Sequence, residues 1–116
     1  MFSNSPILLE TFKQDILKFK MRPGMYINPP NYSRISTFLQ GINHQAGYNL
    51  LFSFPAWLEK KYAIKDALIW ESSIKSIFEK LPDRTKSDEE LVQFLFENIL
   101  EYLEFRENNP NYLFVE

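Results

Sequence analysis

The segment from residue 87 to residue 105 constrains this chain more than any other stretch, because its pattern predicts an embedded helix. It opens with Ser87-Asp88-Glu89-Glu90, a capping box in which the serine oxygen accepts a hydrogen bond from the Glu90 amide and the Glu90 side chain returns one to the serine amide. Placed at 100° intervals, the apolar residues that follow cover an arc of about 240°. A helix that is apolar over so wide an arc needs neighbours, so the rest of the chain must supply other helices.

Apolar residues at helical spacing, together with the placement of Ser, Pro and Gly, predict four further helices. The chain has no internal repeat and no linker long enough to divide domains. Residues 1–116 are therefore predicted to form a single all-α domain, a bundle of about five helices, with residues 112–115 as a short extended tail or edge strand. The four helices are expected to begin at Pro6, after a Ser33 cap, after a Ser53 cap and near Leu68, and to end before Pro23, near Gly47, near Tyr62 and at Leu81.

Residues 22–27, Arg-Pro-Gly-Met-Tyr-Ile, are predicted to form a rigid corner between the first two helices. Pro fixes φ, Gly supplies a positive φ, and Pro29-Pro30 extends the chain. Met25, Tyr26 and Ile27 are then expected to pack back on the core, and Arg22 to meet the carbonyl end of the first helix. The six letters also resemble a segment in the ATPase domain of type II topoisomerases, but the sequence lacks the acidic-asparagine helix and glycine-rich loops that hold nucleotide there. The rim of the corner is a candidate partner contact.

Composition argues against catalysis and against a bound cofactor. The chain has no cysteine and one histidine, His44, so a thiolate zinc site is excluded and a Ser-His-Asp system would depend on that one residue. His44 falls opposite the apolar stripe of its predicted helix and is expected to face solvent or a partner. Three scattered glycines cannot form a phosphate-binding loop. We expect no enzyme, no metal and no cofactor, and, since no segment reads as a signal peptide or a membrane span, a cytoplasmic protein.

Charge is separated along the chain. Residues 1–82 carry a net charge of +4 and residues 83–116 a net charge of −6, a balance poorly suited to direct nucleic-acid binding. On the last predicted helix the polar arc of about 80° is almost wholly acidic. Like charges four apart cost roughly a few tenths of a kcal/mol per pair, so such a strip is solvated, pairs with lysines of other helices, or meets a basic protein partner. We call Glu90, Gln93, Glu97, Glu101 and Glu104 the acidic strip, with Tyr112 and Phe114 as candidate aromatic anchors beside it.

Three segments and two tryptophans carry a family resemblance. They are RPGMYI at 22–27, SRISTFLQGIN at 33–43, Trp57, Trp70 and FLFENILEYLEF at 94–105. In this order they resemble small bacterial immunity proteins of contact-dependent growth inhibition and related polymorphic toxin systems. The chain departs from that pattern at Asn28-Pro29-Pro30, where a glycine is common, and at Asn43, where an aromatic is common.

The resemblance implies a helical protein without catalytic residues, which binds a cognate toxin domain in the cytoplasm and covers its active site or substrate surface. Many such toxins act on nucleic acids and are basic, and the acidic strip would then imitate the charge of the substrate. The alternative is a non-catalytic adaptor or regulatory protein that binds an endogenous partner or another copy of itself. A toxin reading frame beside the gene would favour the immunity function.

Overall fold

A computed structural model describes residues 6–25, 27–45, 51, 53–65, 69–82 and 86–109, apart from the side chains of residues 6–9 and 42–45. Within these segments the chain forms five α-helices and one short 3₁₀ helix, and no strand. The all-α prediction is confirmed, whereas residues 112–115 lie outside the described segments. The elements are α1 Pro6–Met21, η1 Pro23–Met25, α2 Tyr32–Gln45, α3 Phe54–Tyr62, α4 Trp70–Glu79 and α5 Asp88–Asn108.

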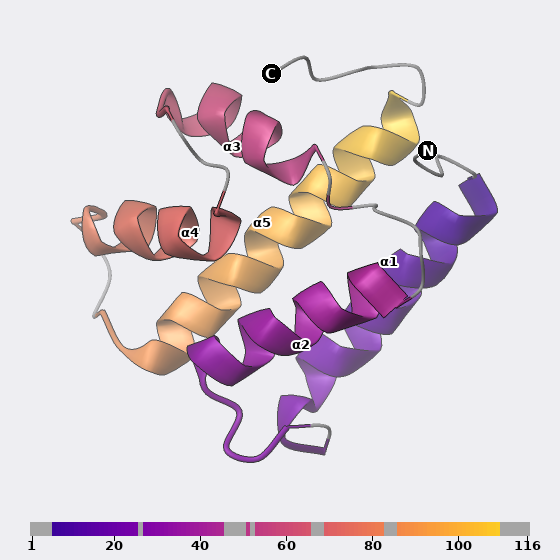
Figure 1. The fold of residues 1–116 in the computed structure, drawn as a ribbon, viewed down its shortest axis with the longest axis horizontal. Helices are drawn as coiled ribbons and strands as arrows, with labels where there is room; N and C mark the ends of the chain where they lie inside the picture. Colours follow the sequence, from indigo (N-terminus) through magenta and orange to yellow (C-terminus); the bar gives the residue numbers. More distant parts are fainter. Residues whose placement is uncertain are drawn as a thin grey trace.

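Helix α5 is the centre of the fold. It crosses the molecule diagonally in Figure 1, with α3 and α4 on one side and α1 and α2 on the other. All four of these helices pack against it. With 21 residues it is about 31 Å long, enough to reach every neighbour. The prediction of an embedded last helix is confirmed by its buried residues, which are Leu91, Val92, Phe94, Leu95, Phe96, Asn98, Ile99, Tyr102, Leu103 and Arg106.

Aromatic rings fill the space on both sides of α5. On one side Phe54 of α3 lies 5.6 Å from Trp70 of α4 and 5.2 Å from Tyr102 of α5, measured between ring centroids. On the other side Phe19 of α1 meets Phe96 of α5 edge-on at 5.6 Å. Such pairs add about 0.5–1.5 kcal/mol each beyond the burial of their area. The central helix is thus held by rings from helices far apart in the sequence.

The start of α2 differs from the prediction. The helix begins at Tyr32, and Asn31 rather than Ser33 is its cap, because Asn31 Oδ1 accepts a hydrogen bond from the Arg34 amide at 2.9 Å. The Tyr32 amide donates to both carboxylate oxygens of Asp88, at 3.1 and 3.3 Å. A carboxylate at the positive end of a helix dipole is favourable. The first residue of α5 therefore helps to fix where α2 begins.

The other helices begin close to their predicted positions. Ser87 caps α5 as expected, since its Oγ accepts a hydrogen bond from the Glu90 amide at 3.2 Å. Ser53 occupies the cap position of α3 with Pro55 in the first turn, although its side chain makes no capping hydrogen bond. Helix α4 begins at Trp70, two residues later than predicted. The start of α5 is set by a local capping bond, which explains why the sequence reveals it.

The corner after α1 is tight, but it is only partly as expected, because Gly24 lies in a 3₁₀ turn and does not adopt the predicted positive φ. In η1 the Met25 amide donates to the Arg22 carbonyl at 3.1 Å, and the Ile27 amide donates to the Pro23 carbonyl at 2.9 Å. Ile27 packs against the core as predicted. Met25 does not, because its side chain is 71% exposed. With three residues per turn, side chains two positions apart point in different directions, so Ile27 on the core side leaves Met25 turned outward. Tyr26 lies outside the described residues. The Arg22 guanidinium reaches the sulfur of Met25.

Candidate functional site

The acidic strip lies on the outward side of α5. Glu90 is half-buried and the other four members are exposed. On the inward side Phe96 is fully buried, and Leu100, at the border of the strip, is half-buried and packs against the core. The prediction that the outward side of α5 is mainly acidic is confirmed. The exposed members are Gln93, Glu97, Glu101 and Glu104.

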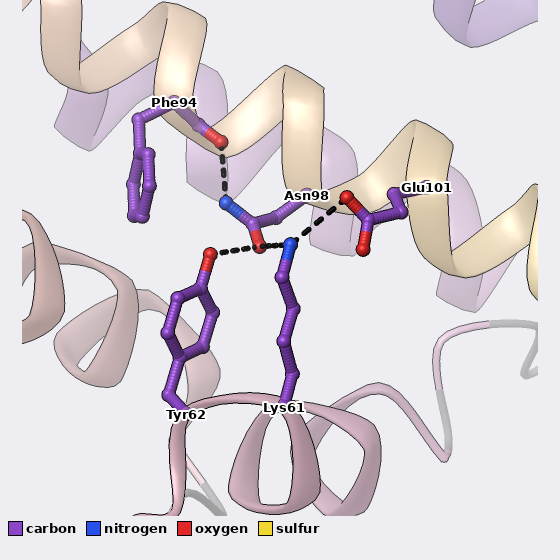
Figure 2. A network of polar contacts seen from close by, with 5 residues as sticks. All are labelled: Lys61, Tyr62, Phe94, Asn98 and Glu101. Carbon is purple, nitrogen blue, oxygen red and sulfur yellow. Dashed lines mark hydrogen bonds and ion pairs between the residues drawn. The ribbon is translucent and has the colours of Figure 1, made fainter.

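One residue of the strip pairs with a lysine of the same molecule. Figure 2 shows Lys61, near the end of α3, with its Nζ 2.9 Å from Oε1 of Glu101. The ammonium also lies 5.0 Å from the ring centroid of Trp57, where cation–π attraction holds it. Because the Glu101 side chain is 57% exposed, the ion pair adds only about 0–1 kcal/mol. Of the alternatives that the sequence leaves open, pairing with another helix is thus confirmed for Glu101.

A buried amide lies behind this ion pair. Asn98 Nδ2 donates to the Phe94 carbonyl at 2.9 Å, and Asn98 Oδ1 accepts from the Tyr62 hydroxyl at 2.7 Å and from Lys61 Nζ at 3.3 Å (Figure 2). Both ends of the amide are therefore satisfied, as a buried polar group requires. The network fixes the end of α3 against α5 and sets the position of Lys61 beside Glu101.

At the far end of α5 the acids meet α1. Glu107 Oε1 lies 2.8 Å from Lys13 Nζ, and this hydrogen bond lowers the pKa of Glu107. The pKa of Lys13 is raised by the same bond and, through charge, by Glu107, Glu10 and Glu104. Glu104 therefore lies close enough to Lys13 for the two charges to interact. The C-terminal half of the strip, Glu101 and Glu104, faces lysines of α3 and α1.

The N-terminal half of the strip borders a hollow of about 380 Å³ between α5 and the corner. Met25, two residues from Pro23 in the same turn, is exposed, and so is Met21 at the end of α1. The structure thus brings the corner and the acidic strip together, which the sequence treats as separate features. A hollow bordered by carboxylates, next to a turn that carries exposed methionines, has the composition of a surface that binds protein. The hollow is lined by Pro23, Pro30, Glu89, Glu90, Val92 and Gln93.

Two buried polar residues of α5 were not predicted from the sequence, Asn98 and Arg106. Arg106 Nη1 donates to the Tyr102 hydroxyl at 2.7 Å. Burial raises the pKa of Tyr102, and the charge of Arg106 with hydrogen bonds to Arg106 and Ser53 offsets part of that rise. Both residues fall inside the apolar arc of the helix, where a polar side chain needs an internal partner. That position is the signal that could have identified them.

Some predicted contacts lie outside the part of the chain that the structure describes. Tyr112 and Phe114, the candidate aromatic anchors, follow the last described residue, Asn109. The side chain of His44 is also outside, although its backbone belongs to α2. The role of these residues stays a prediction.

Comparisons with known proteins gave no relative. No family model matches the chain, and no match was found among curated proteins or among solved structures.

Within the described segments, no three His, Cys, Asp or Glu side chains are grouped so that they could hold a metal ion. In the same segments, no helix has both the length and the apolar character needed to cross a membrane.

Proposed function

We propose that the protein is a non-catalytic, cytoplasmic immunity protein that binds a basic toxin domain through the start of α5 and the adjoining corner. The observation that carries the proposal is the hollow in which Glu89, Glu90 and Gln93 lie opposite Pro23 and Pro30. The resemblance of residues 22–27 and 94–105 to immunity proteins supports the toxin-binding function, and Pro23 of the hollow lies in the first of these segments.

The distribution of charge supports a contact at this end of the strip. Glu101 and Glu104 face Lys61 and Lys13 of their own molecule, so part of their charge is already balanced. At the other end of the strip, Glu90 and Gln93 share a hollow with Glu89, two prolines and a valine. Negative charge on such a surface raises the association rate with a basic partner and rejects acidic ones. A toxin that binds nucleic acid has the basic surface that this charge would select.

Affinity in this proposal comes from apolar anchors next to the charge. Met21, at the end of α1, is 79% exposed, and Met25, within the corner, is 71% exposed. Methionine is flexible and polarizable, so it fits irregular partner surfaces well. In protein interfaces a few desolvated anchors supply most of the binding energy, while surrounding charges contribute mainly to specificity. Met25 is therefore expected to contribute more to affinity than any single carboxylate.

Co-expression with the toxin domain encoded immediately beside the gene tests this function. Wild-type protein should restore growth of cells that produce the toxin domain. Met25→Ser combined with Gln93→Lys should protect much less, while its thermal unfolding stays close to that of the wild type. Failure of the wild-type protein to protect would contradict the immunity function. A stable complex with an endogenous protein, formed without any adjacent toxin gene, would favour the adaptor alternative.

A further inference from the structure

The end of α3 and the second half of α4 enclose a groove of about 500 Å³ on a different part of the molecule. Four apolar residues form its floor. Ile77 is buried, and three others are half-buried although they pack against the core. Lysine and serine side chains line the rest of the groove. The floor consists of Tyr62, Ile64, Ile77 and Leu81, and the rim of Lys65, Ser73, Ser76 and Lys80.

The floor of this groove is held in place before any partner binds. The Tyr62 hydroxyl donates to Asn98 Oδ1, and its ring centroid lies 6.2 Å from that of Phe94. The Ile64 amide donates to the Glu59 carbonyl at 3.1 Å, which closes the end of α3. A surface that is already ordered loses little conformational freedom on binding, so more of its apolar contact appears as affinity.

The lysines of the rim favour a negatively charged partner in the groove. Lys65 and Lys80 are exposed, Ser76 is exposed and Ser73 is half-buried. Two ammonium groups and two hydroxyls favour carboxylates, and they disfavour a basic ligand. Because three of the four rim residues are exposed, a small molecule here would stay open to water over much of its surface, unlike ligands in enclosed pockets. A protein helix would cover the groove with its own flanks.

We propose that this groove is a second docking surface, which binds an acidic amphipathic helix of a partner protein. Apolar side chains of that helix would lie on Tyr62, Ile64 and Leu81, and its carboxylates would meet Lys65 and Lys80, as in helix-in-groove recognition. The inference is separate from the proposed toxin contact, since it uses other residues and a partner of opposite charge. It gives the molecule one acidic and one basic binding surface.

A pair of synthetic peptides tests the groove directly. One has about 16 residues, with Leu at i, i+3, i+4 and i+7 and Glu at the flanking positions, and its twin has Lys in place of each Glu. The acidic peptide is expected to bind at least about tenfold more tightly than the twin. It should also shift the amide NMR signals of Ser73, Ser76 and Lys80. Equal binding of the twins, shifts centred on α5, or no binding of the acidic peptide would overturn the inference.

Variants of the groove provide the matched comparison. Lys65→Glu with Lys80→Glu should weaken binding of the acidic peptide about tenfold and improve binding of the basic twin. Ser76→Trp, which fills the groove from an exposed helical position, should abolish binding of both peptides. Lys75→Glu makes half of that charge change on α4 outside the groove and should change the affinity less than twofold. An effect of Lys75→Glu equal to that of the groove variants would contradict a defined site.

Discussion

The carboxylate of Asp88 accepts a hydrogen bond from the backbone amide of Tyr32, with Oδ2 3.1 Å from the nitrogen. The two residues open α5 and α2 and are 56 positions apart in the chain. Asp88 is followed directly by Glu89 and Glu90, and Tyr32 stands two residues after Pro30. The contact therefore holds together the two segments that line the hollow beside the acidic strip.

Replacing Asp88 should destabilise the protein more than replacing its neighbour. Asp88→Ala removes a carboxylate that satisfies a free amide at the start of α2, and loss of such a cap costs about 1 kcal/mol. Glu89→Ala removes an acid from the same turn of α5 without breaking this bond and should cost only a few tenths, roughly 0.3 kcal/mol. Urea unfolding of both variants gives the comparison. Equal losses would show that the bond to Tyr32 adds nothing to stability.

The buried amide behind the ion pair should matter more than the ion pair itself. Asn98→Ala leaves the Tyr62 hydroxyl and Lys61 without their shared acceptor, at an expected cost of about 1–3 kcal/mol. Glu101→Ala breaks an exposed pair and is expected to cost less than about 1 kcal/mol. Chemical denaturation of the two single variants measures both values. A larger loss for Glu101→Ala would show that the ion pair stabilises the protein more than the buried amide does.

Glycine at position 63 should stabilise the protein. Ala63 ends α3 with φ 54° and ψ 46°, a left-handed conformation in which a Cβ atom costs about 1 kcal/mol. Ala63→Gly should therefore raise the free energy of unfolding by roughly 0.5–1 kcal/mol. Its control is Ala56→Gly, inside the same helix, which should lower stability by about 1 kcal/mol. Thermal unfolding separates the two, and a loss of stability for Ala63→Gly would contradict the assigned conformation.

Lys86 also has a positive φ, 67°, yet glycine should not help there. Its Nζ donates to the Phe78 carbonyl at 2.8 Å and to the Leu81 carbonyl, and it lies 5.3 Å from the centroid of the Phe78 ring. Lys86→Gly relieves the backbone but removes a cation that binds carbonyls at the end of α4. We expect no gain in melting temperature, in contrast to Ala63→Gly. A gain equal to that of Ala63→Gly would show that these contacts do not stabilise the helix end.

The ion pair between α1 and α5 should make stability depend on pH. The folded pKa of Glu107 is lowered from its ordinary 4.5, so its contribution is complete above that pH and is lost as the pH falls through the folded value. The pKa of Lys13 is raised from 10.5, so its contribution persists until the pH rises past the folded value. Glu107→Gln should thus lower the melting temperature at neutral pH, and the difference from the wild type should shrink as the pH falls through the folded pKa of Glu107. A difference that does not change with pH would contradict the pairing.

The sequence predicted the elements whose determinants are local. The Ser87 capping box, Pro55 after Ser53, and Pro23 after α1 each act within one turn of their own helix, so their positions could be read directly. The wide apolar arc of α5 likewise predicted its burial, because the projection of one helix is enough to define it.

Contacts between distant segments could not be predicted in the same way. Asp88 caps α2 and Lys61 reaches Glu101 only because the fold places those helices side by side. The outward direction of Met25 depends on the 3₁₀ turn, which the Pro-Gly pair does not specify. The hollow that joins the corner to the acidic strip likewise exists only because the fold places the corner beside the start of α5. Its residues are therefore known only from the structure.

The most direct test of the central claim is the affinity for a basic toxin domain encoded beside the gene, where the gene's neighbourhood holds one, measured by calorimetry with wild-type protein and charge variants. Glu89→Lys with Gln93→Lys changes the hollow, and Glu79→Lys with Ser72→Lys makes the same charge change on exposed positions of α4. The account predicts that the hollow variant binds at least about tenfold more weakly, with a smaller dependence on salt, while the α4 variant binds like the wild type. Equal affinity of the wild type and the hollow variant would contradict the claim that the partner binds at the start of α5.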